Sequence, residues 1–257
     1  MADEEVQEQL RRRAAFLREM GLDYGLVQRR PIAAAGPGAP GSPRPGSAAA
    51  SSPAGRSLPE ARRDAADPAA ELRRIQEDIG DCRRCRLCEQ RHTVVFGVGN
   101  PHARVMFVGE GPGAEEDARG EPFVGRAGQL LTDIITKGMG LRRSETYIAN
   151  IVKCRPPGNR EPLPDEVDTC LPFLEAQIQA IHPEVIVGLG KTAVQALLGS
   201  PVQITKVRGQ WTNFRGIPLL PTFHPSYLLR NPAAKKDVWA DIQQVMSRLG
   251  LAVRGRV

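Results

Sequence analysis

The chain has 257 residues, and its hydrophobic content of 41% is enough to form a core in one or two domains. Its net charge of +6 favours a polyanionic partner, most often nucleic acid, although a basic surface without such a role is the alternative. No run of about 18 apolar residues occurs, which excludes a helical membrane span, and the acidic start lacks the features of a signal peptide. We therefore expect a cytoplasmic protein in a reducing environment.

The N-terminal part of the chain is predicted to be an extension of the main domain. Within segment 1–29, the apolar residues of 4–27 fall near one face of a helix, so we expect an amphipathic helix. Its three arginines, Arg11–Arg13, leave two interpretations open: the helix docks onto DNA or a partner protein, or it packs loosely on the body. Segment 30–67 consists mainly of Pro, Gly, Ala and Ser, which predicts a flexible, disordered linker.

The remaining segment, 68–257, is predicted to form one domain in which strands and helices alternate. Short apolar runs indicate buried strands at 104–108, 146–149, 184–188 and within 209–221. Helical periodicity occurs at 68–79, 126–138, 165–181, 192–198 and 234–249. This alternation predicts an α/β fold with a parallel sheet covered by helices on both faces, in which ligands bind at the carboxyl ends of the strands.

The five cysteines are predicted to be metal ligands or thiols, because disulfides are rare in a reducing compartment. Cys82 and Cys85 have the spacing of a metal-ligand pair, and Cys154 and Cys170 are their expected partners. Cys88 offers a rival pair with Cys85. Ligation by thiolates alone suits either a [4Fe–4S] cluster or tetrahedral zinc, and the spacing does not choose between them. Scattered buried thiols are the remaining alternative.

An acidic, glycine-rich turn follows the strand predicted at 104–108. Glycines in Gly109–Gly113 allow a ligand to approach the backbone closely. Glu110 and Glu116 make the turn acidic, which repels phosphate and suits the activation of water. A solvated surface turn is the alternative interpretation.

Three further side chains complete a candidate pocket. Phe123, between a proline and a valine–glycine pair, can stack on a base or pack in the core. Asn150 ends a predicted strand, and its amide can match the N3–H and O4 of a pyrimidine or cap the strand. His224 precedes a proline and can donate a hydrogen bond to a carbonyl oxygen that becomes anionic.

These motifs together resemble the family 4 uracil-DNA glycosylases, the iron–sulfur branch of the uracil-DNA glycosylase superfamily. The resemblance covers about residues 80–247. The family's opening pattern is found at Cys82, Cys85, Leu87, Arg91, Val95, Gly97 and Gly99. It continues in order with Gly109–Gly113, with Pro122-Phe123-Val124-Gly125, with Asn150–Pro157 and with His224-Pro225-Ser226. The opening pattern also favours Cys82 and Cys85 as ligands over Cys88.

The resemblance implies a three-layer α/β/α fold around a central, mainly parallel, four-stranded sheet. It also implies a structural [4Fe–4S] cluster, with zinc as the alternative, held by Cys82, Cys85, Cys154 and Cys170. A related branch that forms a covalent link to DNA carries a histidine in an added loop. Arg155–Arg160 stands there in this chain, so covalent capture is not expected.

The activity implied by the resemblance is that of a monofunctional DNA glycosylase, which removes uracil from single- or double-stranded DNA and leaves an abasic site. Phe123 would stack on the base and Asn150 would read its edge, while the backbone of Gly109, Glu110 and Gly111 would hold O2 and position water. His224 would stabilise the departing uracil anion. Glu116 would orient the attacking water, with Glu110 as the alternative.

Residues after the His-Pro-Ser turn are expected to contact DNA, where Tyr227, Leu228 and Arg230 would fill the gap in the duplex and touch phosphate. Because no lysine is predicted in the pocket, we expect base release without a covalent adduct. The protein is expected to act as a monomer associated with the nucleoid. The alternative is a non-catalytic iron–sulfur DNA-binding subunit of the replication or repair machinery. A zinc-dependent base deaminase is excluded because its His-x-Glu and Pro-Cys-x2-Cys motifs do not occur.

Overall fold

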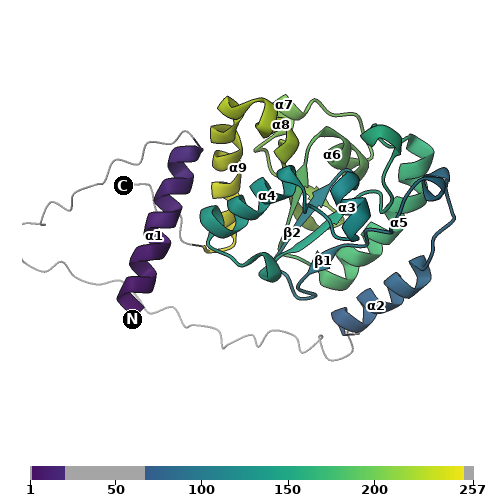
Figure 1. Cartoon of the computed structure of the whole chain (residues 1–257), viewed down its shortest axis with the longest axis horizontal. Coiled ribbons are helices and arrows are strands. Elements are labelled where there is room, and N and C mark those ends of the chain that lie inside the picture. The colour runs from purple at the N-terminus through teal and green to yellow at the C-terminus, as the bar shows by residue number, and fades with distance from the viewer. Residues whose placement is uncertain (1, 21–66, 252–257) are drawn as a thin grey trace, which may run out of the picture. The chain divides into compact units, whose positions relative to one another are not determined.

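The computed structural model describes residues 2–20 and 67–251 (Figure 1). Nearly all of the predicted linker, 30–67, lies outside these described residues. Within the described ranges, no helix combines the length and the apolar character that a membrane crossing requires.

One six-stranded sheet forms the centre of the domain, with the order β1-β3-β2-β4-β6-β5. The strands are β1 (Val98–Gly99), β2 (Val105–Gly109), β3 (Tyr147–Asn150), β4 (Val185–Leu189), β5 (Thr212–Phe214) and β6 (Ile217–Thr222). The four inner strands are parallel, whereas β1 and β5 pair antiparallel at the two edges. The predicted α/β class with a mainly parallel sheet is confirmed. The sheet has six strands rather than four because each edge of the parallel part carries one short additional strand.

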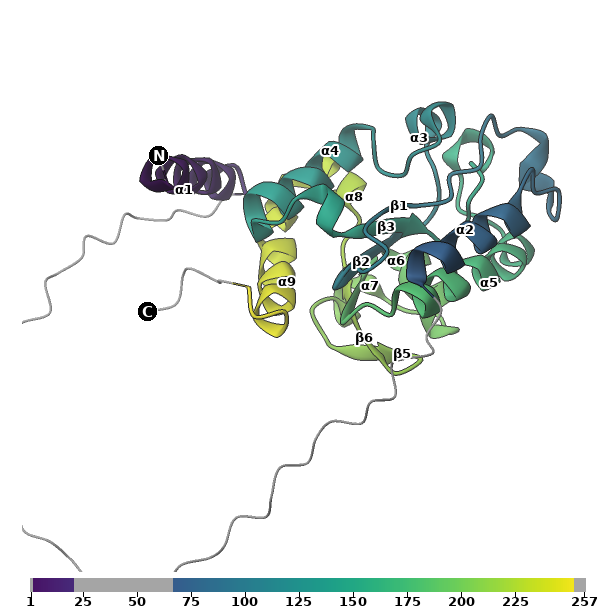
Figure 2. The same ribbon diagram turned by 90° about the horizontal axis from the view of Figure 1, so that it is seen from below.

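Helices cover the sheet on both sides (Figures 1 and 2). The α-helices are α1 (Ala2–Glu19), α2 (Pro68–Ile79), α3 (Ala114–Arg119), α4 (Arg126–Asp133), α5 (Pro164–Ile181), α6 (Lys191–Leu198), α7 (Ile204–Val207), α8 (Pro225–Arg230) and α9 (Lys235–Arg248). Shorter helical segments are η1 (Arg86–Glu89), η2 (Ile134–Met139, a π-helix), η3 (Arg143–Glu145), η4 (Pro157–Asn159) and η5 (Pro232–Ala234). The predicted helices 68–79, 165–181 and 234–249 therefore begin and end within one residue of the observed ones.

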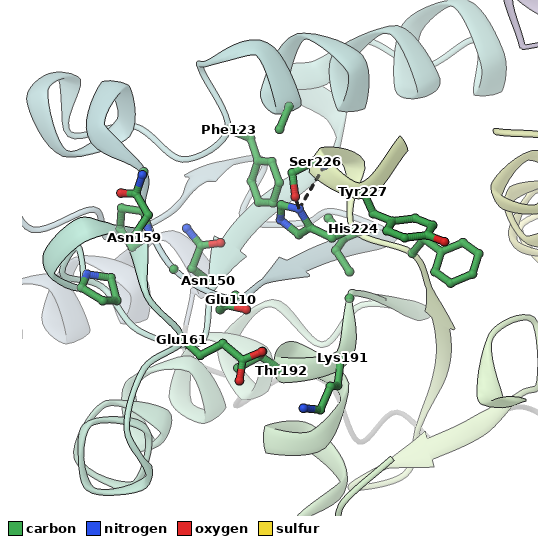
Figure 3. A pocket seen from close by; sticks show the side chains of 18 of the residues that line it. Glu110, Phe123, Asn150, Asn159, Glu161, Lys191, Thr192, His224, Ser226 and Tyr227 are labelled. Carbon is green, nitrogen blue, oxygen red and sulfur yellow. Dashed lines mark hydrogen bonds between the residues drawn. The ribbon is translucent and has the colours of Figure 1, made fainter. Parts of the chain in front are cut away.

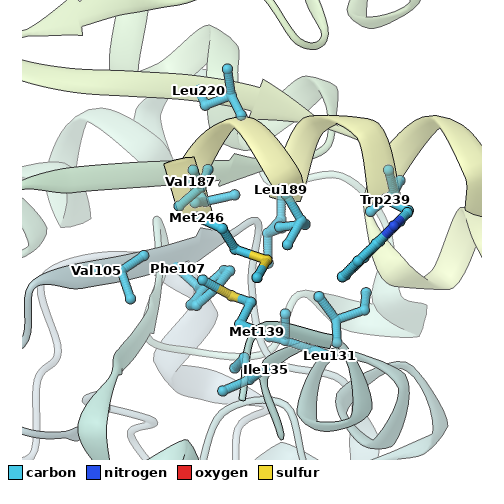
Figure 4. Close-up of a cluster of buried hydrophobic side chains, with 14 of the residues drawn as sticks. Val105, Phe107, Leu131, Ile135, Met139, Val187, Leu189, Leu220, Trp239 and Met246 are labelled. Atoms are coloured by element: carbon cyan, nitrogen blue, oxygen red, sulfur yellow. The ribbon is translucent and has the colours of Figure 1, made fainter. Parts of the chain in front are cut away.

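The inner strands are buried on both faces, which explains why they appear in the sequence as continuous apolar runs. In β2, Val105 and Phe107 point into one hydrophobic cluster, whereas Met106 and Val108 point into a second. Helices η2 and α9 complete the first cluster (Figure 4), and helices α2, α5 and α6 complete the second. The three-layer arrangement implied by the family resemblance is therefore present.

The N-terminal helix α1 contributes apolar side chains to the first cluster. Phe16, Leu17 and Met20 are buried, and the Phe16 ring meets the Trp239 ring edge-on at a centroid distance of 6.2 Å. The side chains of Val6 and Leu10, predicted on the same face, lie outside the described part of the structure. Docking of this helix onto DNA or another protein stays a prediction.

Asp241 of α9 is a buried charge that connects three elements of the fold. Its carboxylate accepts hydrogen bonds from Arg208 at 2.7 and 3.1 Å and from the Thr222 hydroxyl of β6 at 2.6 Å. Removing this partner leaves the Arg208 guanidinium uncompensated. We therefore expect Asp241→Ala to lower the free energy of unfolding by about 3–5 kcal/mol in urea titrations.

The exposed ion pair between Arg104 and Glu184 provides the control. Its closest N···O distance is 2.6 Å, but both side chains are about half exposed. Breaking it with Glu184→Ala is expected to change the free energy of unfolding by at most about 1 kcal/mol. Equal effects of the two substitutions would show that burial does not strengthen the Asp241 interactions.

Candidate functional site

A cavity with a volume of about 640 Å³ opens where the inner strands end. The turn after β2, the end of β3, the turn after β4 and the segment after β6 each contribute to its wall, as expected for a parallel sheet. Among the predicted residues, those that line it are Glu110, Gly111, Glu116, Phe123, Asn150, His224, Tyr227 and Arg230. Figure 3 shows side chains from these separate segments directed toward a common space.

Gly109, the last residue of β2, allows two of these side chains to meet above the sheet. It pairs with Asn150 across the parallel ladder. A Cβ atom at Gly109 would lie 2.5 Å from both the Asn150 amide oxygen and the Phe123 ring. Only a glycine permits this approach, so Gly109 fixes the shape of the cavity floor although it does not line the cavity itself.

The amide of Asn150 is buried without a protein partner. The residue is 1% exposed, and its Oδ1 accepts no hydrogen bond from any described residue. A buried acceptor of this kind costs free energy unless a ligand or water supplies a donor. The amide oxygen therefore offers an unused acceptor to whatever occupies the cavity.

Phe123 has a strained backbone and forms an aromatic wall of the cavity. Its φ angle of 54° lies in the left-handed region, which is uncommon for a bulky residue and costs roughly 1–3 kcal/mol. The ring is 6% exposed, and its centroid lies 5.5 Å from the His224 ring with the planes tilted by 35°. Strained residues of this kind occur often at ligand-binding sites, so the strain supports a role for the Phe123 ring in holding a ligand.

Two charged side chains hold the strained turn around Phe123 from either side. The Glu116 carboxylate accepts hydrogen bonds from the backbone of Val124 and Gly125, each at 3.0 Å. The Arg143 guanidinium donates to the Pro122 carbonyl oxygen at 2.6 Å. These contacts restrict the backbone on both sides of the aromatic residue.

Glu116 is engaged further by the turn after β2, because its second oxygen accepts from the Gly113 N–H at 3.1 Å. A carboxylate that already accepts three backbone hydrogen bonds has little capacity left to orient water. The geometry therefore favours Glu110 over Glu116 as the residue that orients water. Glu116 instead connects the turn after β2 to the turn that contains Phe123.

Glu110 is half-buried beside the segment that begins α6. Burial raises the pKa of its carboxyl, while a hydrogen bond with Thr192 opposes the increase. The negative charge of Glu161 also raises this pKa, and the positive charge of Lys191 lowers it. A carboxylate with a raised pKa is a better proton acceptor than an ordinary one, which suits a general base.

His224 precedes α8 and is held as a neutral imidazole. Its Nδ1 accepts a hydrogen bond from the Ser226 N–H at 3.2 Å and lies 2.8 Å from the Ser226 hydroxyl oxygen (Figure 3). Burial lowers the pKa of the ring to about 4, with the charge of Arg230 acting in the same direction. Because Nδ1 is the acceptor, the proton of the neutral ring is on Nε2, where it can be donated to a ligand.

The leucine that α8 exposes to solvent is Leu229, not the predicted Leu228. Leu228 is fully buried, so it cannot reach into a DNA duplex, whereas Leu229 is 39% exposed. Successive helical residues are about 100° apart around the axis, so the two leucines face different surroundings. Tyr227 is exposed and packs against the Phe223 ring at a centroid distance of 4.8 Å.

Several cavity residues were not predicted from the sequence. Among them are the polar residues Asn159, Glu161, Lys191, Thr192 and Ser226. The prediction that no lysine lines the pocket was wrong, because Lys191 is part of its wall. Lys191 and Thr192 directly follow β4, so the rule that located Asn150 at the end of β3 could have found them. Figure 3 shows the Lys191 ammonium group well apart from Asn150 and His224.

A second, smaller pocket lies among the cysteines. Its lining includes Cys82, Cys85, Cys154 and Cys170 together with apolar side chains, and it does not include Cys88. In the part of the chain that the structure describes, no three Cys, His, Asp or Glu side chains are placed to hold a single metal ion. Four thiols in one pocket can supply the ligands of a thiolate-bound metal group.

Positive groups and N–H donors lie against these sulfur atoms. Arg84 reaches the Cys82 sulfur at 3.7 Å, and Arg91 reaches the Cys154 sulfur at 3.5 Å. The backbone N–H of Lys153 donates to the Cys170 sulfur at 3.3 Å. Burial raises the pKa of the Cys85, Cys154 and Cys170 thiols, and the positive charge of Arg91 and the Lys153 N–H oppose that rise at Cys154 and Cys170.

Comparisons with known proteins agree with this geometry. The sequence profile of the family described as "Uracil DNA glycosylase superfamily" matches residues 96–243. The chain is 50% identical over 177 residues to a Type-4 uracil-DNA glycosylase of Thermotoga maritima, covering 67% of this chain and 92% of that protein. It is 42% identical over 182 residues to one of Sulfurisphaera tokodaii, covering 68% and 83%. For one of Archaeoglobus fulgidus the identity is 39% over 181 residues, covering 66% and 89%.

Proposed function

The chain belongs to the uracil-DNA glycosylase superfamily, and on this premise we propose that it is a monofunctional uracil-DNA glycosylase. It hydrolyses the N-glycosidic bond between uracil and deoxyribose in single- or double-stranded DNA, and leaves an abasic site for base excision repair. The observation that carries this proposal is the unpartnered Asn150 amide, which shares one cavity with Phe123 and His224.

Recognition begins when uracil leaves the base stack, which costs a few kcal/mol. This cost is smallest at mismatches and in single strands. Phe123 stacks on the flipped base, and its strained, doubly held turn keeps the ring in place. The Asn150 amide accepts from N3–H and donates to O4. Cytosine presents the opposite pattern on this edge, so its binding leaves the amide mismatched.

Bond cleavage leaves a sugar with oxocarbenium character and a uracil anion. The Nε2 proton of neutral His224 and the backbone N–H groups of Glu110 and Gly111 stabilise the charge that develops on O2. One such donor contributes about 3–4 kcal/mol to the transition state. Glu110 orients the water that attacks the sugar, while Glu116 positions the Phe123 turn.

Further contacts with DNA come from α8. Tyr227 and Leu229 are exposed at this helix and fill the gap left by the flipped base, and Arg230 pairs with phosphate. This assignment replaces Leu228, which is buried in the core. We infer that the protein acts as a monomer in the cytoplasm, associated with the nucleoid.

A direct assay tests the function. Purified protein is incubated with an oligonucleotide that contains one uracil, and alkali then cleaves any abasic site. Strand cleavage at the uracil position supports the proposal. DNA binding without base release would support a non-catalytic iron–sulfur subunit instead.

Lys191 lines the cavity, and a lysine amine can form a covalent imine with an abasic sugar. Whether the base is released without such an adduct therefore needs its own test. Lys191 belongs to the wall opposite Asn150, so we expect no imine between its amine and the abasic sugar. Borohydride treatment during turnover should therefore trap no protein–DNA adduct. A trapped adduct that disappears with Lys191→Gln would replace the monofunctional mechanism with an imine mechanism.

The cysteine pocket fits a [4Fe–4S] cluster bound by Cys82, Cys85, Cys154 and Cys170. The four thiols share one apolar pocket and have positive neighbours, a setting that suits a thiolate-bound cluster. A cluster held by these four cysteines would link the segment before β1 to α5 and to the loop after β3, and its role would be structural.

Replacing Cys154 by Ser is expected to reduce the iron content of the purified protein to less than one half, because one of four thiolate ligands is lost. Cys88→Ser is the control, since Cys88 lies in η1, close to Cys85 in the sequence, but does not line the pocket. Iron and sulfide analysis with visible absorbance measures both variants. Loss of iron from Cys88→Ser and retention by Cys154→Ser would reverse the ligand assignment.

A further inference from the structure

Lys153 is a buried cation that the proposed mechanism does not use. The residue is 1% exposed, although lysines are seldom buried unless they are paired. Its ammonium group donates to the Asn150 carbonyl oxygen at 2.9 Å and to the Gln177 amide oxygen at 2.6 Å. Both partners are neutral, and one of them belongs to the residue that reads the base.

The same residue also reaches the cysteine pocket. Its backbone N–H donates to the Cys170 sulfur at 3.3 Å, and Lys153 is one of the residues that line the pocket of the four cysteines. Gln177 extends the contact by donating to the Phe96 carbonyl oxygen at 3.0 Å and to the Tyr147 hydroxyl at 3.3 Å. A continuous, buried polar connection therefore runs from the cysteines to both ends of β3.

The charge of Lys153 requires a negative partner. Burying an ammonium group costs several kcal/mol, and two neutral acceptors offset only part of that cost. Among the described residues, no carboxylate pairs with the ammonium group, and the Cys170 sulfur lies against the backbone N–H of the same residue. Four thiolates around a bound cluster place negative charge on that side.

We propose that Lys153 is a positioning residue that couples the cysteine-bound cluster to Asn150. The negative charge of the thiolates holds the ammonium group in the core, and the ammonium group in turn holds the Asn150 carbonyl at the end of β3. The Asn150 amide is thereby fixed above Gly109. This inference rests on the proposed function, and it gives the cluster a role in base recognition in addition to crosslinking.

A double-mutant cycle separates positioning from general stabilisation. Lys153→Met removes the charge and the donor and keeps an unbranched side chain. We expect it to slow single-turnover uracil excision about tenfold and to leave DNA affinity unchanged. If Lys153 acts through Asn150, the double variant N150A/K153M is no slower than N150A alone. Losses that multiply in the double variant would overturn the proposal.

Arg84→Gln is the matched control, because Arg84 also contacts a cysteine sulfur but forms no hydrogen bond with β3. If Arg84→Gln slows uracil excision, its effect on the rate should multiply with the effect of N150A. Iron release to a chelator provides a readout that does not depend on activity. We expect K153M to release iron several-fold faster than the wild type, and unchanged release would contradict the charge coupling.

A second substitution keeps the test valid if K153M does not fold. Gln177→Met removes the acceptor at 2.6 Å and leaves the lysine in place, so the same cycle with N150A applies with a smaller expected loss, about threefold. If the rate reductions caused by Q177M and N150A multiply in the double variant, the proposed coupling would again be overturned. The wild-type protein in the same assay tests the proposed function itself. Absence of base release by the wild type would refute that function, whereas the iron-release result still reports on Lys153.

Discussion

Replacing Asn150 by Ala is expected to slow uracil excision about 100- to 1000-fold while leaving the affinity for DNA within about twofold. The side chain is buried, its oxygen has no partner in the described structure, and it lies directly above Gly109. Its hydrogen bonds are therefore made with the flipped base alone. Most DNA affinity arises from contacts with phosphates, which the substitution does not touch.

Single-turnover kinetics on a uracil-containing oligonucleotide measure the first effect, and fluorescence anisotropy with an uncleavable analogue measures the second. Asn213→Ala is the control, because Asn213 is an exposed asparagine whose Oδ1 accepts from Gly216 in the β5–β6 hairpin. It should excise uracil at the wild-type rate. Parallel losses of rate and affinity in N150A would show that Asn150 supports the DNA surface rather than reading the base.

The parts of the fold that could be predicted are those with a local pattern. Strand β2 is buried on both faces, so it appears in the sequence as an apolar run that ends in a glycine-rich turn. By contrast, β1 has only two residues, a length at which no periodicity exists. It forms because Val98 and Gly99 pair with β3, a contact that is distant in sequence.

The candidate site was predictable to the extent that strand ends determine it. Asn150 ends β3 and Glu110 directly follows β2, and because these strands are parallel neighbours, the two residues lie close together. The exposure of Leu229 rather than Leu228 depends on how α8 packs, which no local pattern specifies. The engagement of Glu116 depends on two turns meeting in space. The burial of Lys153 is the feature that the sequence predicts least well. A lysine is normally expected to be exposed, and only tertiary contacts make its burial tolerable.

Replacing His224 by Ala is expected to slow excision by a factor of about 100 to 1000, since one preorganised donor to the uracil anion is lost. The backbone donors of the turn after β2 remain, so residual activity above background should persist. Single-turnover measurements at pH 8 give the rate. A loss of less than about threefold would remove His224 from the stabilisation of the leaving group.

The protonation of His224 gives a second expectation, which concerns stability. Its pKa in the folded protein is about 4, well below the ordinary value of 6.5, because burial disfavours the imidazolium. Between these two values the unfolded chain binds a proton that the folded protein does not bind. The stabilising contribution is therefore complete above about pH 6.5 and is lost as the pH falls toward 4.

Urea unfolding at pH 7.5 and pH 4.5 measures this contribution. Between these values the wild type should lose about 2–3 kcal/mol more stability than His224→Ala, because the variant lacks the titrating ring. The other acidic groups titrate in both proteins, so the difference between them isolates His224. Equal losses would mean that the ring is not buried as a neutral imidazole, and the assignment of its Nε2 proton to the uracil anion would fail with it.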